Sequence, residues 1–252
     1  MPTYGFCHLP AAPLRKEPSD ASEMVSQLLF GECFRILENN EKWACIENLN
    51  DAYRGYLGSK QYIEIGKDEA ERFSDSSFVS DSVLDSIMLN GNRMLVPMGS
   101  HIPLQKTLDF NKLKISHNIK RHPASLLETA RKLLNSPYLW GGKTCMGIDC
   151  SGFTQTVFST QGVKLKRDAS QQVTQGAEIA SLKLACPGDL CFFDNAEGKI
   201  IHVGILCGDG EIIHASGCVR IDTIDENGIL NRDTLNYTHH LAKICRIQPF
   251  FR

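Results

Sequence analysis

The first part of the chain alternates short apolar stretches with turn-forming residues. Apolar runs of strand length cover residues 27–30, 33–37 and 43–46. Gly31 separates the first two runs, and Asn39 and Asn40 separate the second from the third. Short runs broken by Gly and Asn are typical of strands joined by tight turns. The pattern therefore predicts a small β-barrel module over residues 1–65.

The next stretch, residues 66–117, changes composition twice. Residues 66–85 are charged and then rich in Ser and Asp, with few apolar positions, which predicts a connector. Residues 93–98 and 101–104 again have the apolar pattern of strands. We interpret residues 86–116 as a candidate degenerate second copy of the first module.

Helical spacing of apolar residues begins at Pro123 and continues to about Asn135. Two more helices are expected to begin near Cys150 and near Ser170. Three strands are expected over residues 189–193, 199–207 and 211–216, and the last two flank Gly-Asp-Gly, a strong hairpin signal. Residues 118–252 are therefore predicted to form an α+β unit, with helices first and an antiparallel sheet after them.

Composition limits the class of partner. The chain holds 27 Lys and Arg against 29 Asp and Glu, a net charge of −2, so we expect no nucleic-acid or membrane partner. No apolar run approaches the roughly 18 residues of a membrane helix. The N-terminus has no basic residue before Arg15, unlike a signal peptide.

The ten cysteines stand singly, without C-x-x-C spacing, which favours a reducing cytoplasm and argues against zinc. A removed leader would instead indicate a secreted or periplasmic protein. We expect no metal and no cofactor.

One of these cysteines has the setting of a nucleophile. Cys150 stands where a polar loop, residues 147–149, leads into an apolar helix. Backbone N–H groups at a helix start favour a thiolate and can donate to an oxyanion. With a nearby imidazole, this position predicts the lowest thiol pKa of the ten cysteines for Cys150.

Two histidines complete the candidate site. His202 and His214 each interrupt an apolar strand, at equal distances from Gly208. A hairpin loop with an odd number of residues would place them opposite each other, with Cβ atoms roughly 5 Å apart, and an even number would place them in diagonal contact. The arrangement predicts Cys150 as nucleophile, His202 as its base and His214 as the group that orients the base. Metal binding by the same three residues is the alternative, but no fourth ligand is apparent.

Several segments together resemble the motif series of NlpC-type cysteine peptidases. They are PYLWGG at residues 137–142, GIDCSGF at 147–153, RDASQQ at 167–172, PGDL at 187–190 and the two His strands. The resemblance covers about residues 118–230 and implies a papain-like fold that cleaves cell-wall peptides. It implies the same roles for Cys150, His202 and His214, and it adds Tyr138 as an oxyanion donor.

The N-terminal module is similar to the bacterial SH3-like module of γ-D-glutamyl-L-diamino acid endopeptidases, which recycle cell-wall peptides. The similarity lies within residues 12–62 and includes ASEMVSQLLFGE at 21–32 and DAYRGYL at 51–57. In those enzymes the module walls off one side of the cleft and recognises the free amine of an N-terminal L-Ala. The resemblance implies that Tyr53 and Glu23 contact the substrate.

The peptidase domain supplies the other implied substrate contacts. Asp168 is implied as a partner of the ammonium, because a buried ammonium must be paired with a carboxylate. Ala169 departs from the Ser expected there, so Ser170 or Ser151 takes that contact. Asp149 belongs to the same implied set.

Together the residues and the resemblance imply an endopeptidase that cuts the γ-D-Glu to diamino acid bond of murein tri- or tetrapeptides with a free N-terminal L-Ala. Diaminopimelate and lysine both stay open as the diamino acid. The alternatives are a general cell-wall hydrolase, an amidase or N-acyltransferase on the same fold, and a non-catalytic wall-binding protein.

Overall fold

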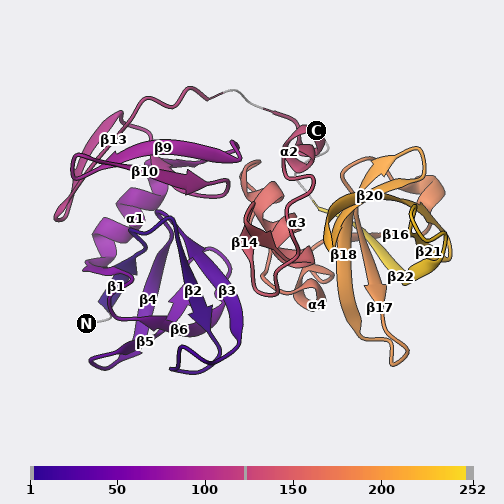
Figure 1. Cartoon of the computed structure of the whole chain (residues 1–252), viewed down its shortest axis with the longest axis horizontal. Helices are drawn as coiled ribbons and strands as arrows, with labels where there is room; N and C mark the ends of the chain where they lie inside the picture. Colours follow the sequence, from indigo (N-terminus) through magenta and orange to yellow (C-terminus); the bar gives the residue numbers. More distant parts are fainter. Residues whose placement is uncertain (1–2, 122–123, 248–252) are drawn as a thin grey trace. The chain divides into compact units, whose positions relative to one another are not determined.

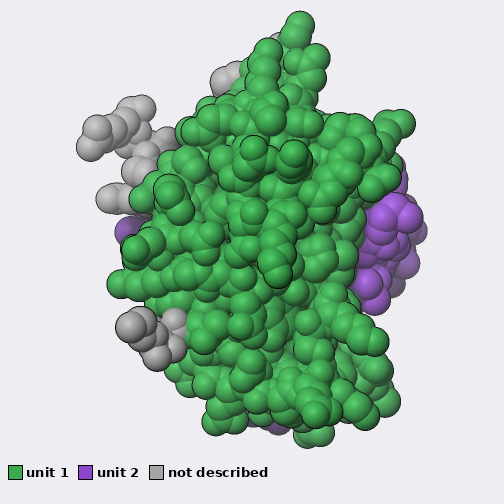
Figure 2. Space-filling view, turned by 90° about the vertical axis from the view of Figure 1, so that its left-hand side faces the viewer, with its two compact units in different colours: residues 1–124, 140–145 green, residues 125–139, 146–252 purple. Residues whose placement is uncertain are grey.

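The computed structural model describes residues 3–121 and 124–247, and the chain forms two compact units (Figure 1). The first unit comprises residues 1–124 and 140–145, and the second comprises 125–139 and 146–252 (Figure 2). Within the described parts of the chain, every helix is too short or too polar to cross a membrane.

The first unit begins with an antiparallel sheet of seven strands in the order β3-β2-β6-β5-β4-β1-β7. The strands are β1 Thr3–Phe6, β2 Ala11–Arg15, β3 Met24–Leu29, β4 Cys33–Asn39, β5 Trp43–Asn48, β6 Arg54–Gly58 and β7 Ile63–Ile65. Alternate residues point inward, as in β5, where Ala44 and Ile46 are buried between half-exposed neighbours. The strands predicted over 27–30, 33–37 and 43–46 correspond to β3, β4 and β5.

The rest of the first unit adds one helix and two smaller sheets. Its elements are α1 Lys67–Asp75, β8 Ser77–Val79, β9 Leu84–Leu89, β10 Asn92–Pro97, β11 His101–Pro103, β12 Thr107–Phe110, β13 Leu113–His117 and β14 Lys143–Thr144. Four strands form a sheet in the order β10-β9-β13-β12, and β11 pairs with β8. The strands expected over 93–98 and 101–104 correspond to β10 and β11.

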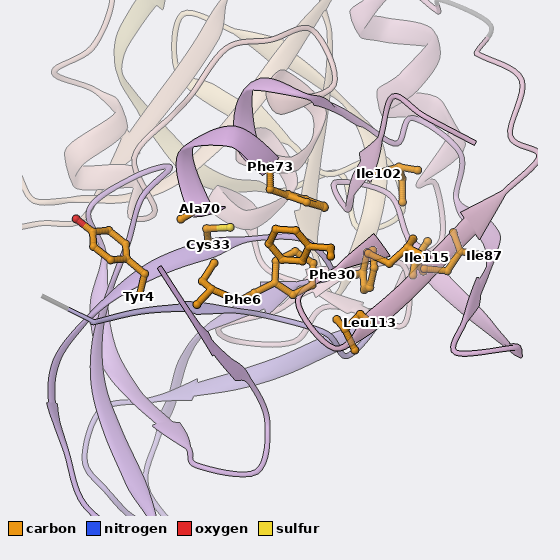
Figure 3. Close-up of a cluster of buried hydrophobic side chains, with 13 residues drawn as sticks. Tyr4, Phe6, Phe30, Cys33, Ala70, Phe73, Ile87, Ile102, Leu113 and Ile115 are labelled. Carbon is orange, nitrogen blue, oxygen red and sulfur yellow. The ribbon is translucent and has the colours of Figure 1, made fainter. Parts of the chain in front are cut away.

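A shared apolar core joins these parts of the first unit (Figure 3). The ring of Phe73 on α1 meets the ring of Phe6 on β1 edge to face, with centroids 4.8 Å apart, and it also contacts Phe110 at 5.0 Å. The segment predicted as a connector therefore contains a helix whose apolar side is buried, because Ala70 and Phe73 lie one turn apart. The division at residues 65 and 117 stays a prediction.

The second unit is built around one antiparallel sheet in the order β16-β22-β17-β18-β19-β20-β21. The strands of the second unit are β15 Gly147–Ile148, β16 Ala177–Ile179, β17 Leu190–Asp194, β18 Ile200–Gly208, β19 Glu211–Ser216, β20 Cys218–Asp225, β21 Gly228–Leu230 and β22 Tyr237–Arg246, and all except β15 belong to this sheet. Because β22 pairs with both β17 and β21, the strands from β17 to β22 close into a six-stranded barrel.

Short helices accompany this barrel: α2 Leu126–Lys132, α3 Cys150–Ser159, α4 Ala169–Gln172 and the 3₁₀ turn Leu182–Leu184. Helix α3 packs against β18 and β19, and it is buried along nearly its whole length. Helix α2 begins after Ser125, whose hydroxyl accepts from the N–H of Glu128. Pro123, where the first helix was expected to begin, lies outside the described residues.

The order of helices before an antiparallel sheet agrees with the prediction, but the α+β class is not confirmed. Strands dominate both units, and the helices are short, from 4 residues in α4 to 10 in α3. The predicted strands correspond to β17, β18 and β19, whereas β20, β21 and β22 were not predicted. Their closure of the barrel depends on pairings between strands distant in sequence.

Candidate active site

The start of α3 is fixed by a buried ion pair. Asp149 caps the helix, with Oδ1 accepting from the N–H of Gly152 at 2.6 Å. Arg167, which is 1% exposed, donates to both oxygens of Asp149 at 3.0 and 2.6 Å. The same guanidinium donates to the hydroxyl of Ser151 at 3.0 Å. These contacts hold Cys150, the first residue of α3, at a rigid helix start.

The geometry therefore gives Asp149 and Ser151 partners within the second unit. Both oxygens of Asp149 accept from Arg167, and Ser151 Oγ lies 3.3 Å from Asp149 Oδ1. This arrangement supports a role in positioning Cys150 for both residues, and their predicted substrate contacts stay predictions. Sequence reasoning assigned no role to Arg167, although it belongs to the RDASQQ segment.

The thiol of Cys150 is buried beside strand β18. The backbone N–H groups of Val203 and Ser151 form hydrogen bonds with the sulfur. Val203 directly follows His202 in the chain. Burial and the charge of Asp149 nevertheless raise the pKa of Cys150 to about 12. The expectation that Cys150 has the lowest thiol pKa is wrong for the protein at rest, because desolvation outweighs the helix start.

The two predicted histidines meet on neighbouring strands of the barrel. The β18–β19 hairpin turns through Asp209 and Gly210, and Gly204 pairs with His214. His202 therefore lies diagonally from His214, which is the even-loop alternative. Nε2 of His202 and Nδ1 of His214 are 2.8 Å apart, so one donates to the other.

Sequence reasoning missed two further groups at this pair. On the far side of His214, Nε2 lies 3.1 Å from Oδ2 of buried Asp222 on β20. His239 of β22 stacks on His202, with ring centroids 4.1 Å apart and planes 23° apart. The Gly217 turn after β19 could have predicted a second hairpin carrying Asp222, but nothing in the local pattern marks His239.

The rings around His202 determine its charge. Burial, then the neighbouring His214 and His239, lower the pKa of His202 well below the ordinary value of 6.5. Phe193 of β17 closes another side at 5.7 Å between ring centroids. His202 is therefore a neutral imidazole at physiological pH, which is the form that a base requires.

Tyr138 lies close enough to Cys150 for their charges to interact. Its N–H donates to the carbonyl of Gly217 at 2.9 Å, and its side chain is partly exposed. Burial, then the charges of Cys150 and Asp149, raise the pKa of Tyr138 to about 12. The phenol therefore keeps its proton and is able to donate a hydrogen bond, as an oxyanion donor must.

The other predicted contacts of the second unit lie at the start of α4. Asp168 is its N-cap and is half-buried, Ala169 is buried, and Ser170 is exposed. The backbone N–H of Asp168 donates to Oε1 of Gln171 at 3.4 Å. The predicted substrate contacts of Asp168 and Ser170 stay predictions.

Tyr53 and Glu23 belong to the first unit. Tyr53 packs against the core of the seven-stranded sheet, and its N–H donates to Oδ1 of Asp51 at 2.9 Å. The carboxylate of Glu23 accepts from Nε1 of Trp140 at 2.8 Å and pairs with Lys16 at 3.4 Å. Their predicted substrate contacts stay predictions.

A metal site was the alternative interpretation of the cysteine and the histidines. Over residues 3–121 and 124–247, no group of three or more His, Cys, Asp or Glu side chains is arranged to hold a metal ion.

Comparison with known proteins gives two family matches. Residues 135–237 match the NlpC/P60 family, and residues 14–61 match the bacterial dipeptidyl-peptidase Sh3 domain. A gamma-D-glutamyl-L-lysine dipeptidyl-peptidase from Bacillus cereus is 35% identical over 126 residues, which cover 49% of this chain and 37% of that protein. The match therefore spans little more than a third of that relative.

Two further comparisons extend over most of the chain. A dipeptidyl-peptidase 6 from Lysinibacillus sphaericus is 27% identical over 266 residues, covering 90% of this chain and 94% of that protein. The crystal structure of an NlpC/P60 family protein from Bacillus cereus has a TM-score of 0.79 at 21% identity, over 98% of this chain and 100% of that one. The second likeness shows the fold alone.

Proposed function

We propose that this chain, which carries an NlpC/P60 domain behind a bacterial SH3-type domain, is a cysteine peptidase acting on cell-wall peptides. The observation that supports this best is the 2.8 Å hydrogen bond between His202 and His214. His202 lies on β18, and the next residue of that strand, Val203, donates its N–H to the sulfur of Cys150. A buried neutral imidazole beside a buried thiol is the arrangement that nucleophilic catalysis by cysteine requires.

In the proposed reaction, Sγ of Cys150 attacks the scissile carbonyl carbon while its proton passes to His202. Tyr138 and backbone N–H groups at the start of α3 donate to the oxyanion. His202 returns the proton to the leaving amine as the C–N bond breaks, which leaves a thioester. Water then attacks the thioester, His202 takes the proton of that water, and the thiol is restored as the acid leaves.

For the substrate, we propose the bond between γ-D-Glu and the diamino acid of murein tri- or tetrapeptides with a free N-terminal L-Ala. The name of the Bacillus cereus relative, a gamma-D-glutamyl-L-lysine dipeptidyl-peptidase, supports the γ-D-Glu side of that bond. The name dipeptidyl-peptidase of the second relative supports release of two residues from an N-terminus. A role in recycling such peptides in the cytoplasm is part of the same proposal.

The test is cleavage of defined peptides by the purified protein. L-Ala-γ-D-Glu-diaminopimelate and L-Ala-γ-D-Glu-L-Lys are incubated with the protein, and mass spectrometry identifies the products. We expect L-Ala-D-Glu and the free diamino acid, and loss of essentially all turnover in Cys150→Ala. Cys145→Ala is the matched control, because Cys145 is a free, half-buried thiol five residues earlier. Equal turnover by Cys150→Ala and the wild type would refute the proposal.

A further inference from the structure

A carboxylate stands at the far end of the histidine pair, and four donors converge on it. Oδ2 of Asp222 accepts from Nε2 of His214 at 3.1 Å and from Nε of Arg220 at 2.8 Å. Oδ1 accepts from Nη2 of Arg220 at 2.9 Å and from the N–H of Arg232 at 3.0 Å. Asp222 is thus a fully hydrogen-bonded buried carboxylate, and one of its partners belongs to the proposed site.

These donors keep Asp222 ionised. Burial by itself raises the pKa of a carboxyl group, but hydrogen bonds from His214, Arg220 and the Arg232 N–H hold the pKa of Asp222 well below its ordinary range. An ionised carboxylate has no proton to give, so it can only accept hydrogen bonds.

When each imidazole carries a single proton, as at about pH 8, an acceptor at this end determines where the two protons lie. Because Asp222 only accepts, Nε2 of His214 carries a proton and Nδ1 is bare. The 2.8 Å contact must then take its proton from Nε2 of His202. A neutral His202 protonated on Nε2 has a free Nδ1, which is the nitrogen able to take a proton from a thiol.

We propose that Asp222, held by Arg220, is a positioning residue that sets the tautomers of His214 and His202 and keeps Nδ1 of His202 free as the base. The inference rests on the proposed cysteine-peptidase function and assigns a role to two residues of β20. As the sulfur of Cys150 bonds to the carbonyl carbon, its proton moves to Nδ1 of His202. The positive charge formed there is stabilised through His214 by the Asp222 carboxylate.

A purely structural role for the same carboxylate can be separated by a matched control. Asp189 is also buried and also pairs with an arginine, since Arg246 donates to its two oxygens at 2.9 and 2.7 Å. Its other hydrogen bond comes from the N–H of Cys186 at 2.8 Å, not from a histidine. Asp189→Asn therefore removes the same kind of ion pair from the same unit without touching the histidine pair.

The direct test reads the tautomers themselves, and it needs no substrate. Long-range ¹H–¹⁵N spectra of protein labelled in its histidines are recorded at about pH 8, where imidazoles are neutral. We expect Nε2 to be protonated in both His202 and His214. A wild-type His202 protonated on Nδ1 would overturn the inference, and it would do so whether or not the protein cleaves a peptide.

The variant Asp222→Asn adds the functional arm. Nη2 of Arg220 and the N–H of Arg232 both donate at the Oδ1 position, so the amide oxygen takes that position. The amide N–H₂ then faces His214 and reverses both tautomers. We expect Nδ1-protonated His202 and a fall in kcat/KM of roughly 10³–10⁴-fold. Asp189→Asn is expected to keep the wild-type tautomers and kcat/KM. Unchanged tautomers in Asp222→Asn, with or without a loss of activity, would contradict the assigned role.

Arg220→Lys covers the case in which Asp222→Asn does not fold. It preserves a cation beside an ionised Asp222, so we expect wild-type tautomers. Reversed tautomers in this variant would show that Asp222 does not set them. Absence of peptide cleavage by a wild type with the expected tautomers would count against the proposed function and leave the tautomer assignment standing.

Discussion

His202 owes its protonation state to the rings packed around it. His214 approaches from β19, His239 stacks from β22, and Phe193 closes the side of β17. The pKa of His202 lies well below 6.5 because of burial, and because its two imidazole neighbours, His214 and His239, disfavour a positive charge on its ring. Removing the stacked ring should therefore raise that pKa toward its ordinary value.

This predicts a shift in the acid limb of the pH profile. The base must be neutral, so kcat/KM falls as pH drops through the pKa of His202, and in the wild type this limb lies well below pH 6.5. His239→Ala lets water reach His202, so its acid limb should move to higher pH. His239→Phe keeps the face dry and should leave the limb near its wild-type position.

The measurement is kcat/KM for L-Ala-γ-D-Glu-diaminopimelate between about pH 4 and 8, the range in which imidazoles titrate. His240→Ala is the control, because His240 is the next residue and is paired with Asp194 at 2.8 Å. An acid limb that is identical in the wild type and in His239→Ala would show that the stacked ring does not affect His202.

Local sequence carried enough signal to find Cys150, His202 and His214, because Cys150 stands where a polar loop meets an apolar helix and each histidine interrupts an apolar strand. Asp222 and His239 lacked such a signal. Asp222 lies in β20, where polar and apolar residues are mixed, and His239 lies on a largely exposed part of β22. Asp222 reaches His214 through the β19–β20 hairpin. His239 reaches the site because the barrel closes, and that closure depends on the pairing of β22 with β17 and β21.

At the scale of elements, the short segment 140–145 is bonded to a sheet of the first unit that is far away in sequence. Nζ of Lys143 pairs with Glu32 at 3.0 Å, and both side chains are almost fully buried. The N–H of Lys143 donates to Oε1 of Gln27 at 2.7 Å. No local pattern could predict this pair, since its members are 111 residues apart.

The buried pair makes a testable contribution to stability. Breaking a buried ion pair by removing one partner costs about 3–5 kcal/mol, because the other charge stays buried. We therefore expect Lys143→Met to lower the free energy of unfolding by about 3 kcal/mol at neutral pH. Glu32→Gln combined with Lys143→Met should recover part of the loss, because the amide can still accept from the N–H of Leu29. Urea unfolding measures both.

The loss should also depend on pH, in a definite direction. Burial raises the pKa of Glu32, but Lys143 and then His101 outweigh it and hold that pKa below its ordinary value. In Lys143→Met the burial is less compensated, so the pKa rises and the folded state favours the protonated acid. The variant should therefore lose less stability at pH 5 than at pH 8. Equal losses at the two pH values would indicate that Glu32 is not desolvated.

At the scale of the whole chain, the order of modules could be predicted because barrel strands and amphipathic helices have different apolar periods. The small size of the helices could not, because α3 is buried on nearly every side and its boundary depends on capping by Asp149. The role of α1 was missed because Ala70 and Phe73 are its only buried residues in a charged stretch. Their partner Phe6 lies in β1, far away in sequence.

The proposed substrate predicts selection by charge at the N-terminus of the peptide. Acylation of L-Ala removes its ammonium, and the pairing of that charge with a carboxylate such as Asp168 is lost at a cost of roughly 3 kcal/mol. We expect kcat/KM for L-Ala-γ-D-Glu-diaminopimelate to exceed that of its N-acetyl form by about a hundredfold or more. Asp168→Asn should narrow this ratio by slowing the free peptide.

Two further variants test the source of that selection, and the first of them is a control. Asp209→Asn removes a carboxylate from the tight turn between β18 and β19, where Asn tolerates the φ of +52°, and should keep the wild-type ratio. Tyr53→Phe removes one hydroxyl from the first unit and should reduce kcat/KM for the free peptide if that hydroxyl contacts L-Ala. Equal rates on the two wild-type substrates, or release of peptides from purified wall sacculi, would replace peptide recycling with general cell-wall hydrolysis.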